Sequence, residues 1–145
     1  MTEFTLIYDK FLSKLTDFSL AQLDQEVLEL DLQERLKTAI SDFTSLPEEY
    51  TIIDQTNKSF IKNLTIEEQN IIATLMVINY LDKYILSEDN MRILLNSKDY
   101  KQYSQVSLLK ELKATKSEYQ SDVDAKMNSY SFRKKFRKKL KDNKV

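Results

Sequence analysis

The stretch LTIEEQNIIATLMVINYLDKYI, residues 64–85, decides the fold of this 145-residue chain. It opens with Thr65 and Glu68, the spacing of a capping box, in which each side chain accepts a hydrogen bond from the backbone N–H of the other residue. Apolar residues then recur at helical spacing, and Met76–Ile78 make the segment apolar on more than one face. We therefore predict a central helix from residue 66 to about residue 85.

Downstream of this helix, Ser87–Asn90 are expected to break it, and a short helix is expected over residues 91–95, followed by a loop at residues 96–99. From about Ser104 the pattern is helical again. A narrow apolar stripe suited to packing against one partner or neighbour runs along that helix through Val106, Leu109, Leu112, Tyr119, Val123, Met127 and Tyr130.

Upstream, apolar residues at helical spacing predict a helix over residues 1–15 and a second over residues 24–43. Short β-branched and aromatic runs predict a small hairpin within residues 50–64. The fold class is thus mainly α, a small bundle of four to five helices with a long C-terminal helix and one short hairpin. We expect a helical domain over residues 1–130 and a basic C-terminal tail over residues 131–145.

The residue types that are absent exclude several classes of function. The chain has no glycine, histidine or cysteine. Glycine-rich phosphate loops, zinc fingers, Ser-His-Asp triads and thiol nucleophiles are therefore impossible. The apolar runs are shorter than the ~20 residues of a membrane span, and the first residues lack the basic start of a secretory signal.

One fragment, Glu111-Leu-Lys113, matches the E-x-K element of some metal-dependent nucleases, and Glu67-Glu68 or Glu88-Asp89 are conceivable Mg²⁺ ligands. Such nucleases place this element on a strand beside further carboxylates, whereas here it lies in the middle of a predicted helix. We therefore predict no catalytic residue, no metal site and no cofactor, and expect a protein that is not an enzyme.

Charge is distributed unevenly along the chain. Residues 131–145 hold eight of the 22 basic residues and one of the 23 acidic ones, so residues 133–145 carry a net charge of +7 and residues 1–132 a net charge of −8. In a helix, Phe132, Phe136 and Leu140 share one face. The candidate partner-binding residues are Phe132, Arg133, Lys134, Lys135, Phe136, Arg137, Lys138, Lys139 and Leu140.

Composition leaves four interpretations of this tail open. It can bind nucleic-acid phosphates, and eight contacts would give a slope of log K against log salt of about −7. It can dock on another protein, including the acidic body of a neighbouring copy. It can lie on a membrane surface, or be a solvated, disordered segment. Upstream, Tyr100 and Tyr103 are candidate interface anchors, although tyrosines at a helix entry also serve ordinary packing.

Three segments in order, LTIEEQNIIATLMVINYLDKYI (64–85), SEDNMR (87–92) and NSKDYKQYSQVSLLKELK (96–113), resemble small head–tail connector (adaptor) proteins of tailed phages that infect Gram-positive bacteria. In that family a capped apolar helix leads into an S-x-E/D-N-x-R-like turn, and a long helix with a basic end follows. The resemblance covers residues 65–139, just over half of the chain.

The resemblance implies a structural subunit of the virion neck, made in the host cytoplasm. Such adaptors form a ring, typically twelvefold, beneath the portal protein, extend the DNA channel and contact the next neck or tail protein. Their partners would be the portal, neighbouring copies and non-specifically the packaged DNA, with no membrane. Arg92, Asp99, Tyr100 and Tyr103 are then the candidate subunit-interface residues. The alternative function is a small helical nucleic-acid-binding protein that uses the basic tail.

Overall fold

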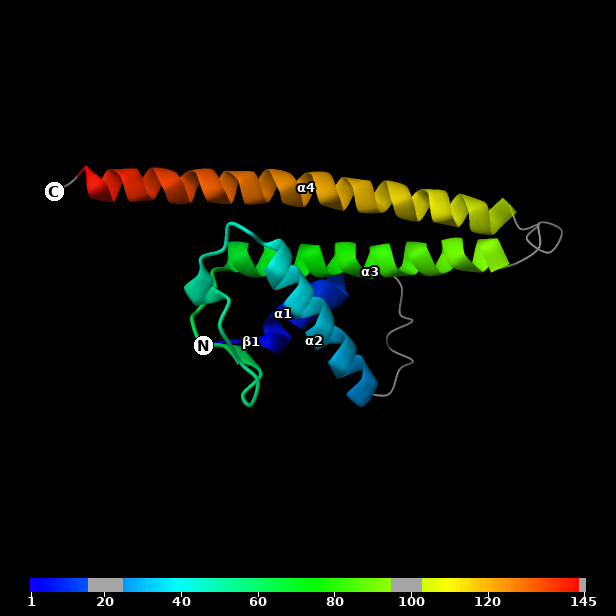
Figure 1. Ribbon diagram of the computed structural model, residues 1–145, viewed down its shortest axis with the longest axis horizontal. Helices are drawn as coiled ribbons and strands as arrows, with labels where there is room; N and C mark the ends of the chain where they lie inside the picture. The colour runs from blue at the N-terminus through cyan, green and yellow to red at the C-terminus, as the bar shows by residue number, and fades with distance from the viewer. Residues whose placement is uncertain (16–24, 95–102, 144–145) are drawn as a thin grey trace.

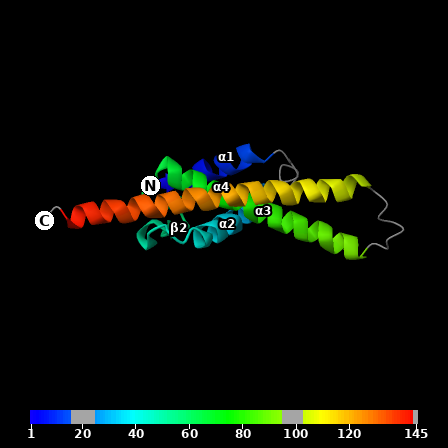
Figure 2. The ribbon, with the colours of Figure 1, turned by 90° about the horizontal axis from the view of Figure 1, so that it is seen from above.

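The computed structural model describes residues 1–15, 25–94 and 103–143, which form four α-helices and a small antiparallel sheet. The sheet lies at one end of a central helix, α3, and the other helices pack around α3 (Figures 1 and 2). The mainly α fold with a long C-terminal helix is thus confirmed. The helices are α1 (Phe4–Lys14), α2 (Gln25–Asp42), α3 (Ile66–Leu94) and α4 (Tyr103–Asp142), with a 3-10 turn, η2, at Glu48–Tyr50.

The sequence of α3 explains its central place. Residues 71–78 are all buried, and the side chains of Ile71, Ile72 and Met76 are fully enclosed. A helix with no polar face over two turns requires neighbours on all sides. α1 and α2 cover one side of α3, and α4 runs back antiparallel along the other (Figure 1).

The predicted capping box opens α3. The Thr65 amide donates to Glu68 Oε1 at 2.8 Å, and the Glu68 amide donates to Thr65 Oγ1 at 3.2 Å. These two bonds satisfy backbone N–H groups that have no partner in the first turn of a helix. The beginning of α3 is therefore determined by residues three positions apart.

The predicted break after residue 85 is wrong, because α3 continues through Ser87–Asn90 to Leu94 and absorbs the short helix expected over residues 91–95. Serine, aspartate and asparagine each cost only about 0.5 kcal/mol in a helix interior, and neither glycine nor proline forces an end here. Polar residues alone were a poor stop signal. The loop expected at residues 96–99 lies outside the described residues.

The predicted hairpin is confirmed as β2 (Ile53–Asp54) and β3 (Ser59–Phe60), paired antiparallel. A turn without glycine connects them. Asp54 Oδ1 accepts from the amides of Thr56 and Asn57 at 2.9 and 3.2 Å, and Lys58 adopts φ 49°. Local side-chain hydrogen bonds of this kind replace the usual Asn-Gly signal.

A third strand, β1 (Thr2–Glu3), was not predicted. The helix expected over residues 1–15 begins only at Phe4, because Thr2 and Glu3 pair with β3 and complete a sheet of order β1-β3-β2. Thr2 Oγ1 also accepts a hydrogen bond from the buried Leu64 amide at 2.8 Å. The first residues thus connect the N-terminus to the beginning of α3.

The apolar stripe of α4 packs within the chain. Val123 is fully buried, Tyr130 is 9% exposed, and Leu112, Tyr119 and Met127 pack against the same core. The partner of this stripe is therefore largely the chain's own α3. The side chains of Val106 and Leu109 lie outside the described part. In the described helices, no segment is long and apolar enough to cross a membrane.

Candidate functional site

The basic segment of the chain is helical and extends beyond the body. α4 continues without a break through residue 131 to Asp142, and in two views it runs past the beginning of α3 (Figures 1 and 2). We call residues 131–142 the projecting end. The proposed division into a domain of residues 1–130 and a separate tail stays a prediction, and the helix crosses that boundary.

Phe132, Phe136 and Leu140 form an apolar ridge on the projecting end. Their exposed fractions are 70%, 55% and 46%, and the two phenyl rings stack with their centroids 6.5 Å apart. Phe132 follows the fully buried Val123 by nine residues, or about two and a half turns, which places it on the opposite side of the helix. The ridge therefore faces away from α3.

The basic residues of the projecting end divide into two groups. Arg133 pairs with Glu67 at the beginning of α3, and Lys134 turns toward the body. The other basic side chains make no ion pair with any residue of the described segments. This second group consists of Lys135, Arg137, Lys138, Lys139 and Lys141.

A cluster of side chains with a buried centre, which we call the clamp, joins the base of the projecting end to the body. Glu68 is only 4% exposed, and its Oε2 accepts a hydrogen bond from the Tyr130 hydroxyl at 2.6 Å. Lys134 Nζ donates to the same hydroxyl at 2.8 Å. Thus α4 is attached to the first turn of α3. The members of the clamp are Tyr50, Thr65, Glu67, Glu68, Tyr130, Arg133 and Lys134, and Arg137 lines the same pocket.

Burial and charge in the clamp shift the pKa values of Tyr130 and Lys134. Burial raises the pKa of the Tyr130 hydroxyl, and its hydrogen bond to the Glu68 carboxylate raises it further. Burial lowers the pKa of the Lys134 ammonium, although the charges of Glu68 and Glu49 oppose this shift. The ammonium also lies 5.3 Å from the ring centroid of Tyr50 and 4.9 Å from that of Tyr130. Two aromatic faces therefore compensate part of its lost hydration.

The candidate subunit-interface residues are not brought together by any described contact. Arg92 lies near the end of α3 and Tyr103 begins α4, but the side chains of both are outside the described part. Asp99 and Tyr100 are also outside the described residues. Their interface role stays a prediction.

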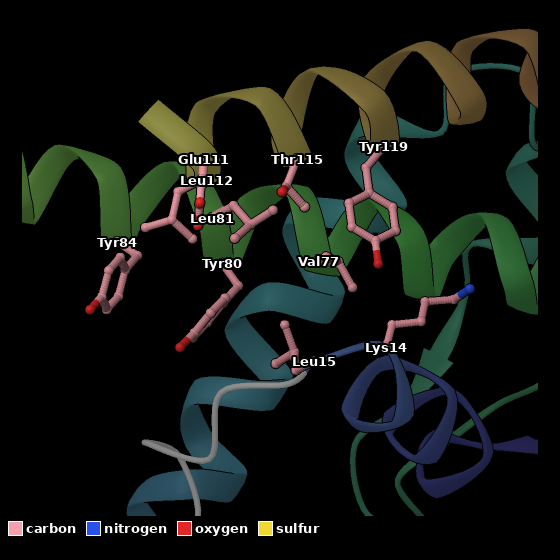
Figure 3. Close-up of a pocket in the computed structure, with 10 residues that line it drawn as sticks. All are labelled: Lys14, Leu15, Val77, Tyr80, Leu81, Tyr84, Glu111, Leu112, Thr115 and Tyr119. Atoms are coloured by element: carbon pink, nitrogen blue, oxygen red, sulfur yellow. The ribbon is translucent and has the colours of Figure 1, made fainter. Parts of the chain in front are cut away.

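A cavity of about 590 Å³ lies between the end of α1 and the α3–α4 pair. In Figure 3, Tyr80 and Tyr84 extend from α3, Tyr119 extends from α4, and Lys14 comes from α1. Glu111 of the E-x-K fragment also lines it. Among the described residues, no group of three or more aspartate, glutamate, histidine or cysteine side chains could hold a metal ion.

Sequence reasoning identified the ridge but not the clamp. Glu68 was recognised as half of a capping box and, with Glu67, as a conceivable Mg²⁺ ligand, and Tyr130 only as the last residue of the apolar stripe. Their hydrogen bond joins residues 62 positions apart, so no local pattern contains it. Comparison of the chain with protein-family models, curated proteins and solved structures returns no match.

Proposed function

We propose that this chain is a structural subunit of the neck of a tailed phage, a head–tail connector that forms a ring beneath the portal protein. The observation that carries the proposal is the projecting end, a helix directed away from the body with an exposed apolar ridge among basic side chains. A helix with anchors at i, i+4 and i+8 is suited to binding in a groove of another protein. In the neck, that groove belongs to the portal or to a neighbouring copy.

The outward face of α4 favours a groove over a flat anionic surface. Glu118 and Asp122 stand 18 residues before Phe136 and Leu140, which is about five turns, so all four lie on one face. A membrane laid along the ridge would meet these carboxylates, although Asp122 is paired with Lys126 at 2.9 Å. A groove that receives only the projecting end avoids them.

The energies fit assembly on a partner better than tight binding by a single copy. Burying three ridge side chains contributes about 1.5–3 kcal/mol each, and association costs about 4–15 kcal/mol. One projecting end therefore binds weakly. In a ring, several such ends engage together, and the effective concentration of the later ones is high. This agrees with a subunit that is monomeric alone and assembles on a portal.

The decisive experiment is quantitative mass spectrometry of purified virions from the source phage. We expect this chain and the portal protein in a ratio near one to one, retained after a high-salt wash. Absence of the chain from washed virions would reject the proposed function.

Binding to purified portal rings tests the role of the ridge. We expect Phe132→Ser/Phe136→Ser/Leu140→Ser to lower the affinity about a thousandfold or more. The matched control is Leu30→Ser/Ile61→Ser/Leu86→Ser, which removes three side chains of similar exposure, 60%, 53% and 61%, from other surfaces. Equal losses in both variants would contradict a specific role of the ridge.

The second candidate function is nucleic-acid binding by the projecting end. Five basic side chains there have no ion-pair partner in the described residues, so contacts to phosphates would give a slope of log K against log salt of about −4.5. Duplex DNA titrated against the isolated chain tests this. Binding that Lys135→Glu/Lys139→Glu abolishes and the ridge variant retains would favour this candidate.

A further inference from the structure

One carboxylate, that of Glu68, serves two helices. Its Oε1 accepts from the Thr65 amide at 2.8 Å and completes the cap of α3, and its Oε2 accepts from the Tyr130 hydroxyl at 2.6 Å and holds α4. With the side chain buried, both oxygens have these protein partners in place of bulk water. The beginning of α3 and the exit of α4 are therefore joined through a single residue.

Tyr130 is the second centre of the clamp. Its hydroxyl donates to Glu68 and accepts from Lys134, and its ring packs against Phe43 at a centroid distance of 5.2 Å. Arg133, three residues after Tyr130 on α4, pairs with Glu67. Two contacts from α4, Tyr130 with Glu68 and Arg133 with Glu67, thus converge on the first turn of α3.

Because the clamp lies at the base of the projecting end, a small rotation there displaces the ridge by a larger distance. From Tyr130 to Leu140 the helix rises about 15 Å, so a rotation of 10° at the clamp moves the ridge by roughly 3 Å. A binding surface must be held to within about 0.5 Å and 10–20° to fit its partner. The direction set at the clamp therefore decides whether the ridge can enter a groove.

We propose that Glu68 and Tyr130 are positioning residues for docking: they set the direction of the projecting end and couple it to the cap of α3. The clamp also engages Arg133, which pairs with Glu67, and Lys134, which donates to Tyr130, so these two basic residues of the projecting end already have partners within the chain. This inference rests on the proposed docking role, and neither positioning residue needs to touch the partner.

The absence of cysteine from the chain permits a direct test. Leu140→Cys on the projecting end and Ile61→Cys on the body replace side chains that are 46% and 53% exposed, and both accept spin labels. Pulsed electron-spin resonance on the full chain then measures the distance between the labels. We expect one narrow distribution in the otherwise unchanged protein.

Two variants weaken the clamp in different ways. Tyr130→Phe removes the hydroxyl and leaves the ring. Glu68→Gln retains one oxygen for the cap of α3, because a capping box can use glutamine in place of glutamate. It replaces the oxygen that faces Tyr130 with an NH₂ group, which cannot accept a hydrogen bond. We expect both to raise the population of displaced ends about fivefold, the effect of one lost hydrogen bond. In Glu68→Gln, hydrogen exchange at the Thr65 amide should stay unchanged.

Tyr119→Phe is the matched control, because Tyr119 lies on the same stripe of α4 and is partly buried outside the clamp. An unchanged distribution in Tyr130→Phe and Glu68→Gln, or equal broadening in Tyr119→Phe, would overturn the inference. A functional readout follows: at equal folded fraction, Tyr130→Phe should bind portal rings more weakly, by at most about fivefold, because the apparent affinity falls with the fraction of correctly directed ends. The distance measurement needs no partner, so its failure rejects the clamp alone, whereas absence from virions rejects the proposed function alone.

Discussion

Two parts of helix α4 differ in where their apolar side chains point. Over residues 112–130 the apolar stripe faces α3 and is buried or partly buried, whereas over residues 131–142 the apolar side chains face the opposite way. The buried stripe ends at Tyr130, and the next residue on that face, one turn later, is Lys134. From Phe132 onward, the apolar side chains lie on a different face of the helix from Tyr130, which is a change of phase in the apolar pattern. A helix thus changes from packing within its own chain to presenting a surface without any change in its backbone.

The comparison predicts that a substitution by aspartate destabilises the protein strongly on the buried face and hardly at all on the exposed face. Val123→Asp places a charge at a fully buried site and should cost about 4 kcal/mol or more, enough to unfold much of the protein. Phe132→Asp, at a site that is 70% exposed, should change the free energy of unfolding by less than about 0.5 kcal/mol. Urea denaturation measures both, and equal losses would mean that the ridge is packed within the chain.

The junction between the two parts should show an intermediate effect. Tyr130→Phe leaves the Glu68 carboxylate and the Lys134 ammonium without a shared partner, so we expect a loss of about 1–3 kcal/mol in the free energy of unfolding. Tyr119→Phe should cost less than about 0.5 kcal/mol. Thermal and urea unfolding of the two variants, followed side by side, decide whether the clamp contributes beyond ordinary packing.

Alkaline titration tests the clamp by a different route. Burial raises the pKa of Tyr130, and it also raises the pKa of Tyr8 in α1, from the ordinary value of 10.0. The folded state then keeps protons that the unfolded state loses, so stability is complete below pH 10 and falls as the pH rises above it. The lowered pKa of Lys134 acts in the opposite direction. Tyr130→Phe should make the fall shallower, and an identical pH profile would contradict the burial of this hydroxyl.

The smallest expected effect is on the stability of the ridge variant. Because Phe132, Phe136 and Leu140 are exposed, replacing all three with serine should leave the free energy of unfolding within about 0.5 kcal/mol and the urea m-value unchanged. Circular dichroism and urea titration check this. A large loss of stability would show that the ridge serves the fold, and would remove the reason for treating it as a docking surface.

Local patterns in the sequence predicted much of the fold. The cap of α3 depends on Thr65 and Glu68 alone, and the stripe of α4 depends on helical periodicity, so the cap and the part of the stripe from Leu112 to Tyr130 were confirmed. Polar composition was a weaker signal, because Ser87–Asn90 lie inside α3. Polar side chains near a predicted helix end indicate a break only when a residue such as glycine or proline also disfavours the helical backbone.

By itself, the sequence determined the helical segments apart from the beginning of α1 and the end of α3, as well as the hairpin, the phase change between Tyr130 and Phe132 and the uneven charge, because each depends on residues a few positions apart. Only the tertiary structure decided that Thr2 and Glu3 form a strand, that Glu68 holds Tyr130, and that Arg133 pairs with Glu67. Those contacts join residues about 60 positions apart. Their free energy exists only once packing has brought the segments together, and no local pattern records it.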